Sequence, residues 1–184
     1  AETNFKVCRK VKPKSLEQLS AVVAIARPGA LDFADQYATY SASGVFQLVH
    51  DFFKDELSYT GGIPLYQEQL MKMAVRLGFT LDESEQLRRI VGKKKVDQMP
   101  AWQGKIRQKV AEQNLDPAIG DVLWKVAEDS ANYSFNKSHS ISYAILAAWT
   151  AYLKFKYPHE FFLALLRLSK FEPDSHHEIN KISK

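Results

Sequence analysis

The sequence predicts an all-α protein built from many short helices. Glycine and proline divide the chain into segments in which apolar residues recur every three or four positions, as on one face of a helix. Several segments open with a capping residue or a proline, which are typical helix starts. No run alternates apolar and polar residues between paired turn signals, the pattern that would indicate β-strands.

The first predicted helix is Ser15–Ala26, "SLEQLSAVVAIA", with Ser15 as a suitable N-cap and the turn at residues 27–29 as its end. Its apolar residues follow at spacings of three, four and three: Leu16, Leu19, Val23 and Ala26. Residues 31–60 are mixed in character. Within them Val45–Phe53, "VFQLVHDFF", fits either a short strand or a helix, and we expect a helix.

The next two helices have clearer signals. Pro64 suits the first turn of a helix that Gly78 ends. Its apolar stripe contains Tyr66, Leu70, Met73, Ala74 and Leu77. Thr80–Glu83 fits a capping box and opens a helix that runs through Val91 and closes at Gly92.

The remaining helices are predicted from caps and prolines. Asp97 is expected to cap a helix with Pro100 in its first turn, and Asp116 to cap another with Pro117 at its first position. The predicted ranges are 97–113, 116–131, 140–156 and a last helix that opens at Pro158. The polar tail after residue 168 is expected to be a linker or the start of a further domain.

Composition indicates a soluble globular protein of one large domain or two small ones. Of the 184 residues, 46% are apolar and 25% are charged, and the net charge of +4 permits a polyanionic partner without requiring one. Cys8 is the one cysteine, so no intrachain disulfide can form. This fits a reducing, cytoplasmic location and argues against a structural zinc site.

No targeting or membrane segment is expected. The N-terminal residues contain no apolar core of a signal peptide. The longest apolar helix core, Ile141–Leu153, has 13 residues, whereas a bilayer requires about 20. Because the first residue is Ala rather than Met, we expect a processed product or a piece of something longer.

Five cations lie within eight residues of the stretch "LRRIVGKKK": Arg88, Arg89, Lys93, Lys94 and Lys95. On a helix with about 3.6 residues per turn, the arginine pair points directly away from the apolar face. Guanidinium forks on a rigid helix, followed by ammonium groups in a turn, suit phosphate binding. The alternative is a solvated face, because Glu85 lies three and four residues before the arginines and can form ordinary ion pairs.

The stretch "NYSFNKSHS", residues 132–140, immediately precedes a long apolar helix. Helix-start N–H groups lack intrahelical partners and carry partial positive charge, so Ser138 or Ser140 could simply cap them. Capping alone does not explain Asn136, Lys137 and His139 together. A nucleoside triphosphate would use the lysine charge, the amides and the histidine. Both interpretations remain open at this point.

Two single residues add weaker indications. Gln67, in "YQEQ", lies beside the apolar stripe, where its amide could contact a base or backbone or could simply edge a core helix. Arg27, in "ARPG", lies at a rigid turn and is either a phosphate ligand or a cation at a helix C-terminus.

No catalytic or metal-binding motif is present. The sequence contains no Asp-x-Asp pair, Walker loop, GxSxG or HExxH motif. Asp32 and Asp35 are three residues apart, but nothing else supports a metal site there, and His176 and His177 lie in the polar tail. Two-metal catalysis would need acidic ligands that this sequence does not obviously supply.

Four patches, taken in order, resemble the fingers domain of the family C bacterial replicative polymerases, the DNA polymerase III alpha subunit. They are "ARPGA" (26–30), "YQEQLMKMA" (66–74), "LRRIVGKKK" (87–95) and "YSFNKSHSISYAILAAWTAYLKFKYPHEFFLALL" (133–166). The resemblance covers roughly residues 10–168. Each patch is weak alone, whereas the four in sequence are highly specific.

The departures from the family pattern suggest a divergent member, for example from a phage. The region between "RPG" and "YQEQ" is shorter than usual, and Ala30 replaces the usual proline. The acidic catalytic residues of the family lie in a palm domain ahead of this region, and nothing here matches them.

The resemblance implies a helical wall over the nascent base pair. Arg88 and Arg89 would grip the triphosphate of the incoming dNTP. Asn136, Lys137 and His139 would lie at the nucleotide pocket, with the histidine near the sugar. The DNA- or phosphate-binding residues would be Arg27, Gln67, Lys93, Lys94 and Lys95.

The resemblance also implies a DNA-directed DNA polymerase, a nucleotidyltransferase, of which this chain alone is inactive. Mg²⁺ would be held by the palm and not by this chain. Partners would be the DNA template-primer, dNTP, the palm and thumb of the same polymerase and, in the full protein, a sliding clamp. Residues 1–168 would form the fingers domain and residues 169–184 a polar tail or the start of the next domain.

Two alternatives stand beside this hypothesis. One is a non-catalytic helical DNA-binding module or polymerase-derived regulator, and the other is a purely structural helical bundle. The polymerase hypothesis requires that the two cation clusters lie on the same side of the molecule and that their charges are not already cancelled by neighbouring carboxylates.

Overall fold

All regular elements in the described part of the chain are helices, which confirms the all-α prediction. The structure is a computed structural model that describes residues 2–93, 97–171 and 173–182. The chain forms two compact units, residues 1–143 and residues 144–184. Among the described residues, the β-type pairing is a single isolated parallel bridge between Tyr66 and Phe135.

The described residues of the first unit form eight α-helices and the start of a ninth. They are α1 (Glu2–Val11), α2 (Leu16–Ile25), α3 (Ala34–Ser43), α4 (Lys54–Leu57), α5 (Gln67–Arg76), α6 (Leu81–Gly92), α7 (Met99–Glu112) and α8 (Pro117–Tyr133). Short 3₁₀ turns precede α3, precede α4 and follow α4. Helix α9 (Lys137–Lys156) begins in the first unit, and α10 (Pro158–Ser169) and α11 (Ser175–Ile182) belong to the second.

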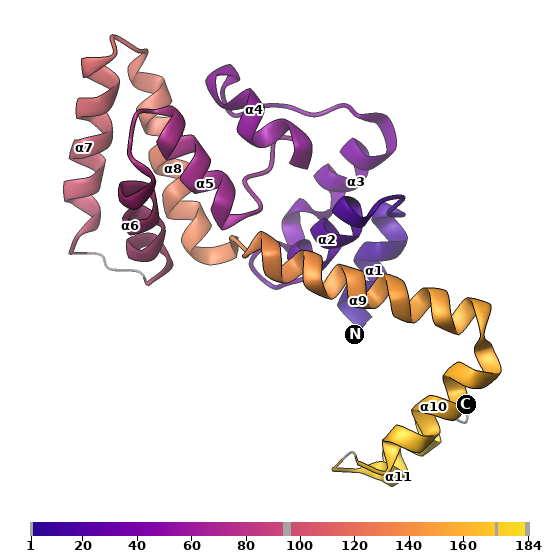
Figure 1. Ribbon diagram of the computed structural model, residues 1–184. Coiled ribbons are helices and arrows are strands. Elements are labelled where there is room, and N and C mark those ends of the chain that lie inside the picture. Colours follow the sequence, from indigo (N-terminus) through magenta and orange to yellow (C-terminus); the bar gives the residue numbers. More distant parts are fainter. Residues whose placement is uncertain (1, 94–96, 172, 183–184) are drawn as a thin grey trace. The chain divides into compact units, whose positions relative to one another are not determined.

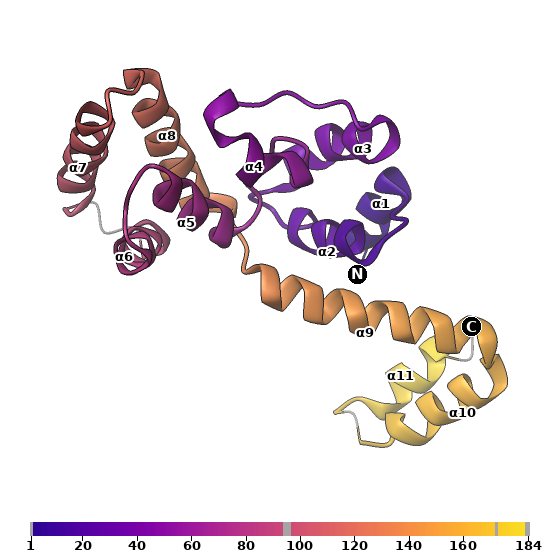
Figure 2. The same ribbon diagram turned by 45° about the horizontal axis from the view of Figure 1, so that its top comes forward.

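Two hydrophobic cores hold the first unit together. Helices α5, α6, α7 and α8 pack side by side (Figure 1) around one core that includes Leu70, Met73, Leu87, Ile106 and Leu123. Helices α1, α2 and α3 pack together (Figure 2) around the other. That second core includes Val7, Ile25, Tyr37, Leu65 and Tyr66. Since Tyr66 directly precedes α5, the start of α5 lies where the two cores adjoin.

The helix starts predicted from side-chain caps are largely confirmed. Thr80 and Glu83 form the expected reciprocal capping box of α6. The carboxylate of Asp116 accepts from Ala118 N at the start of α8, with Pro117 in the first turn. Pro158 opens α10. The stripe predicted for α5 is buried throughout: Tyr66, Leu70, Met73, Ala74 and Leu77.

The helix expected over Val45–Phe53 is wrong for most of its length. Residues 45–50 have no regular secondary structure, and only Asp51–Phe53 forms a 3₁₀ turn. The reason is a close backbone approach, because a side chain on Gly62 would collide with the carbonyl of Gln47. The imidazole of His50 then accepts from Phe52 N and starts the turn.

Smaller differences concern faces and boundaries. The stripe proposed for α2 is not its buried face: Leu16 is exposed, whereas Ala21, Val22, Ala24 and Ile25 are buried. This helix is apolar on several sides, so spacing alone cannot select the packed face. Helix α7 is capped at Gln98 rather than Asp97 and has no side-chain cap. Helix α9 begins at Lys137, about one turn earlier than predicted.

Four further helices in the described part of the chain were not predicted from sequence. Helices α1 and α3 had no clear start signal, α4 begins after the last residue of the helix expected over Val45–Phe53, and α11 lies in the tail predicted to be a linker or the start of a further domain. The boundary predicted at residue 168 stays a prediction.

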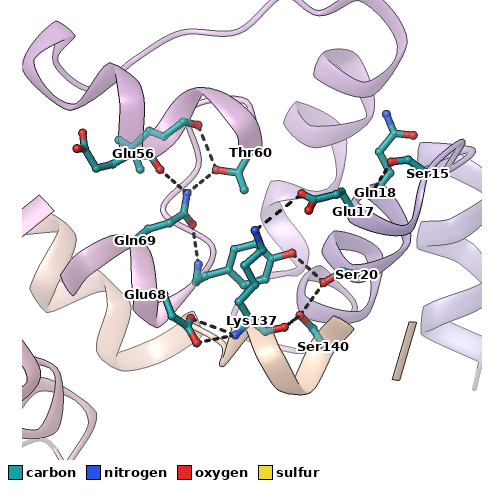
Figure 3. Close-up of polar contacts among 12 residues, drawn as sticks. Ser15, Glu17, Gln18, Ser20, Glu56, Thr60, Glu68, Gln69, Lys137 and Ser140 are labelled. Atoms are coloured by element: carbon teal, nitrogen blue, oxygen red, sulfur yellow. Dashed lines mark hydrogen bonds and ion pairs between the residues drawn. The ribbon is translucent and has the colours of Figure 1, made fainter. Parts of the chain in front are cut away.

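Gln69 is a buried polar hub at the start of α5. Its side-chain amide donates to Glu56 O at 2.9 Å and to the Thr60 hydroxyl at 2.7 Å, and its oxygen accepts from Tyr66 N at 2.8 Å (Figure 3). The residue is fully buried. The Gln69 side chain therefore supplies hydrogen-bond partners to the backbone N–H of Tyr66, directly before α5. It also binds the carbonyl of Glu56 in α4 and the hydroxyl of Thr60 in the 3₁₀ turn after α4.

We expect Gln69→Ala to lower the free energy of unfolding by about 2–4 kcal/mol, because it leaves buried donors and acceptors without partners. Urea denaturation measures this change. Gln86→Ala on the exposed side of α6 is the matched control and should change stability little. An equal effect of both variants would contradict the assigned role of Gln69.

Candidate nucleotide and phosphate site

The start of α5 is joined to the segment that leads into α9. Phe135 N donates to Leu65 O at 3.1 Å, and Gln67 N donates to Phe135 O at 2.9 Å. These two hydrogen bonds hold residues 65–67 against residues far away in sequence. The patches "YQEQ" and "FNKSH" are thereby brought side by side.

Glu68 binds the start of α9. Its carboxylate accepts from Lys137 N at 3.0 Å through each oxygen and from Asn136 Nδ2 at 3.1 Å. A carboxylate is favoured there because the helix N-terminus carries partial positive charge. This contact was not predicted from sequence, and no local signal could reveal it because the partners are 68 and 69 residues apart.

Asn136 is the local cap of α9. Its Oδ1 accepts from His139 N at 2.9 Å and from the Ser138 hydroxyl at 2.6 Å. The prediction that Ser138 or Ser140 caps this helix is therefore wrong. Because Lys137 N and His139 N already have internal acceptors, the suggestion that these two amides bind phosphate is also not supported.

The side chain of Lys137 lies against two aromatic rings. Its Nζ lies 4.6 Å from the centre of the Tyr59 ring and 5.7 Å from that of Tyr66. A carboxylate oxygen of Glu17 lies 3.8 Å from the same nitrogen. The ammonium group is thus held by two ring faces and one long ion pair.

A chain of buried hydroxyl groups lies beside Lys137. The Ser140 hydroxyl donates to Lys137 O at 3.0 Å and lies 2.7 Å from the Ser20 hydroxyl, which lies 3.2 Å from the Tyr66 hydroxyl. If Ser140 gives its one proton to Lys137 O, then Ser20 donates to Ser140 and Tyr66 donates to Ser20. Burial raises the pKa of Tyr66, which keeps the phenol protonated as that donor requires.

The arginine pair on α6 shares one carboxylate. Arg88 donates from Nε to one Glu85 oxygen and from Nη2 to the other, both at 2.6 Å, and Arg89 Nε donates to Glu85 at 2.8 Å. These hydrogen bonds, from Arg88 first, lower the pKa of Glu85 to about 2. The ion pairs that the spacing allowed are therefore formed.

Arg88 and Arg89 differ in their contacts and in their exposure to solvent. Arg88 also donates to the side-chain oxygen of Gln67 at 3.2 Å, and its side chain is 29% exposed, whereas that of Arg89 is 65% exposed. The prediction that both point directly away from the core is therefore wrong for Arg88. This side chain leans against the start of α5.

The two cation clusters consequently meet at α5. Gln67 contacts Arg88 of α6, and its neighbour Glu68 contacts the first residue of α9. The segments that carry Arg88 and Lys137 therefore adjoin, and the first requirement stated above, that both clusters lie on one side, stays a prediction. The second is not met for Arg88, Arg89 and Lys137, because the two arginines share Glu85 and Lys137 faces Glu17. A polyanionic ligand would therefore have to compete with these carboxylates for the cations.

A row of rings lies beside these clusters. The guanidinium of Arg27 lies 4.5 Å from the centre of the Phe135 ring, which lies 5.5 Å from the ring of His139. The ring of His139 in turn lies 4.7 Å from that of Tyr143, which is 55% exposed. Gly29 makes the turn possible, because a Cβ there would collide with the backbone carbonyl of Asn132.

The other predicted phosphate ligands follow α6. Lys93 is exposed, and Lys94 and Lys95 lie outside the described residues. Within the described ranges no group of three or more His, Cys, Asp or Glu side chains could hold a metal ion. None of the helices described combines the length and apolar character needed to cross a membrane.

Comparison with known proteins identifies the family. Residues 2–114 match the bacterial DNA polymerase III alpha subunit finger domain. The DNA polymerase III subunit alpha of Aquifex aeolicus is 40% identical over 167 residues, 88% of this chain, and that of Thermus aquaticus is 34% identical over 173 residues, 90% of this chain. The chain belongs to the family of DNA polymerase III alpha finger domains.

The chain spans 14% of the length of each of these two relatives. Within the polymerase finger domain, the family match includes Arg27, Gln67, Arg88 and Arg89, whereas Asn136, Lys137 and His139 lie beyond its last matched residue. The resemblance seen in the four sequence patches is confirmed. A phage origin stays a prediction.

We expect Arg88→Ala to raise the pKa of Glu85 from about 2 towards its ordinary value of 4.5. The reason is that hydrogen bonds from a cation stabilise the ionised carboxylate, so their loss favours protonation. NMR titration of the Glu85 carboxyl carbon measures this shift. Arg89→Ala should give a smaller rise, and an unchanged value in both variants would show that the arginines do not hold this carboxylate in solution.

Proposed function

We propose that this chain is the fingers portion of a replicative DNA-directed DNA polymerase and that it binds the triphosphate of the incoming dNTP. The observation that carries the proposal is the meeting of two cation clusters at the start of α5. Gln67 contacts Arg88, and the adjacent Glu68 contacts Lys137 N. Membership in the family of polymerase finger domains supports the same conclusion.

The triphosphate ligands in this proposal are Arg88, Arg89 and Lys137. Guanidinium forks give bidentate hydrogen bonds to phosphate oxygens, and the ammonium group adds a point charge. Asn136 acts indirectly, since its side chain caps α9 and contacts Glu68. Its role is to hold the turn that positions Lys137 and His139.

The exposed rings of His139 and Tyr143 suit the sugar and base of the nucleotide. Every base has a face that can stack on an aromatic ring, and these two rings are neighbours with their centres 4.7 Å apart. The triphosphate of such a nucleotide would extend towards the cations at the start of α5.

Template phosphates would be bound by Arg27, Lys93, Lys94 and Lys95. Phosphate contacts of this kind give affinity without sequence preference and weaken as salt is added. Gln67 contributes by holding Arg88 rather than by contacting DNA.

Chemistry would require parts of the polymerase outside this chain. The carboxylates of the candidate site, those of Glu17, Glu68 and Glu85, each bind cations or helix amides. They do not fit a metal site, so the proposal places Mg²⁺ and its acidic ligands in a palm domain. A thumb, a DNA template-primer, a sliding clamp and a cytoplasmic location belong to the proposal for the whole polymerase.

We expect Arg88→Ala and Arg89→Ala each to weaken dNTP binding by the 184-residue chain about tenfold or more, since each removes charge-assisted hydrogen bonds to phosphate. Isothermal titration calorimetry with dTTP measures the affinity. Arg107→Ala removes an exposed arginine of α7 and is the matched control, with no expected effect.

The same variants test the alternative of a non-catalytic DNA-binding module. If they leave dTTP affinity unchanged and weaken binding to duplex DNA, the alternative is correct. The exposed Lys93 and the mild positive charge of +4 are the features that favour it. A purely structural bundle would bind neither ligand.

The chain alone should not extend a primer. The reason is that the carboxylates of its candidate site are already committed to cations and amides, so no two-metal centre can form there. A primer-extension assay with Mg²⁺ and all four dNTPs tests this point. Extension by the purified chain that persists across independent preparations would place catalysis within it and contradict the assignment to a palm.

A further inference from the structure

We propose that Glu85 is an affinity-determining residue of the polyphosphate site, an internal competitor whose carboxylate an incoming triphosphate must displace from Arg88 and Arg89. This inference rests on the proposed function. It concerns a residue that the sequence analysis treated only as a possible source of ordinary surface ion pairs.

The carboxylate occupies the positions that phosphate oxygens would take. Both oxygens of Glu85 lie 2.6 Å from nitrogens of the Arg88 guanidinium, and one of them also lies 2.8 Å from Arg89 Nε. A planar carboxylate on a guanidinium fork has the same bidentate geometry as a phosphate. A polyphosphate therefore cannot use both arginines until Glu85 has moved.

Glu85 is the displaceable carboxylate of the site. Within the described residues its only side-chain partners are the two arginines. Glu68, which also faces Arg88 electrostatically, is held by hydrogen bonds from Asn136 Nδ2 and Lys137 N. Because these bonds anchor it to the start of α9, an anion would leave Glu68 in place and exchange with Glu85.

Glu85 is not needed to keep Arg88 in place. The Arg88 guanidinium retains a second contact, to the side-chain oxygen of Gln67 at 3.2 Å, and its side chain is 29% exposed against the start of α5. Removal of the Glu85 charge therefore frees the guanidinium N–H donors of Arg88, while the contact with Gln67 still holds the Arg88 side chain. The end of competition for the Arg88 donors should outweigh the loss of one contact that holds Arg88 in place. We therefore expect removal of the Glu85 charge to tighten anion binding.

The magnitude follows from ion pairs between residues three and four apart on a helix, which contribute about two- to threefold each to an equilibrium constant. Two such pairs broken by the ligand predict a gain in affinity of about three- to tenfold when the competing charge is absent. A gain of function is informative here, because damage to the fold would weaken binding instead.

The test compares dTTP binding by the 184-residue chain and by Glu85→Gln in the same calorimetric assay. We expect about three- to tenfold tighter binding by the variant. Glu83→Gln on the same helix is the matched control. It removes the same charge, and glutamine can still serve the capping box with Thr80. An equal gain in this control would indicate general electrostatics and would overturn the inference.

Glu85→Asp tests whether the charge of this carboxylate, rather than the length of the side chain, sets the affinity for dTTP. It keeps the carboxylate, so the affinity for dTTP should stay near that of the unchanged chain. Inorganic tripolyphosphate should show the same order of affinities as dTTP, because the competition concerns phosphate alone. Unchanged or weaker binding by Glu85→Gln would overturn the inference.

The outcome for Glu85 can be told apart from that of the proposed function. If Arg88→Ala and Arg89→Ala leave dTTP affinity unchanged, the arginines do not bind nucleotide and both proposals fail. If these two variants weaken binding but Glu85→Gln gives no gain, only the inference about Glu85 fails.

Discussion

The carboxylate of Glu68 on the first amide of α9 is the contact on which the candidate site depends. It joins residues 69 positions apart in the sequence, and it does so beside the backbone pairing of Gln67 with Phe135. Lys137, the first residue of α9, is thereby held against the start of α5. Gln67 also contacts Arg88, so two adjacent residues of α5 contact α6 and α9. Loss of this junction would separate the charges that the proposed function uses together.

A second constraint is electrostatic. A folded domain that gathers cations for a polyanion must remain stable when that polyanion is absent, and like charges held close together repel. Here Glu85 lies between Arg88 and Arg89, and Glu17 faces Lys137 at longer range. The rings of Tyr59 and Tyr66 add a neutral attraction for the ammonium group. Under the proposed function, such internal partners would stabilise the unliganded protein and lower its affinity for the ligand.

Local sequence predicted much of the fold. The capping box at Thr80 and the Asp116 cap were recognisable because the atoms involved lie within three residues of each other. The irregular segment at 45–50 was not recognisable, because its conformation depends on the approach of Gln47 to Gly62, which lies elsewhere in the chain. The order of the four sequence patches nevertheless indicated the polymerase family, and the comparisons confirmed it.

The sequence by itself determined the helical class, the starts of α2, α6, α8 and α10 and the presence of two cation-rich segments, since these depend on neighbouring residues and on the 3.6-residue period. Only the tertiary structure decided that the two segments meet and which carboxylate faces each cation. Glu68 and Glu17 come from helices remote in sequence from Lys137, so no spacing rule could pair them with it. Long-range packing selects such partners because it fixes which helix ends lie side by side. Each charged side chain then pairs with an opposite charge that this packing brings within reach.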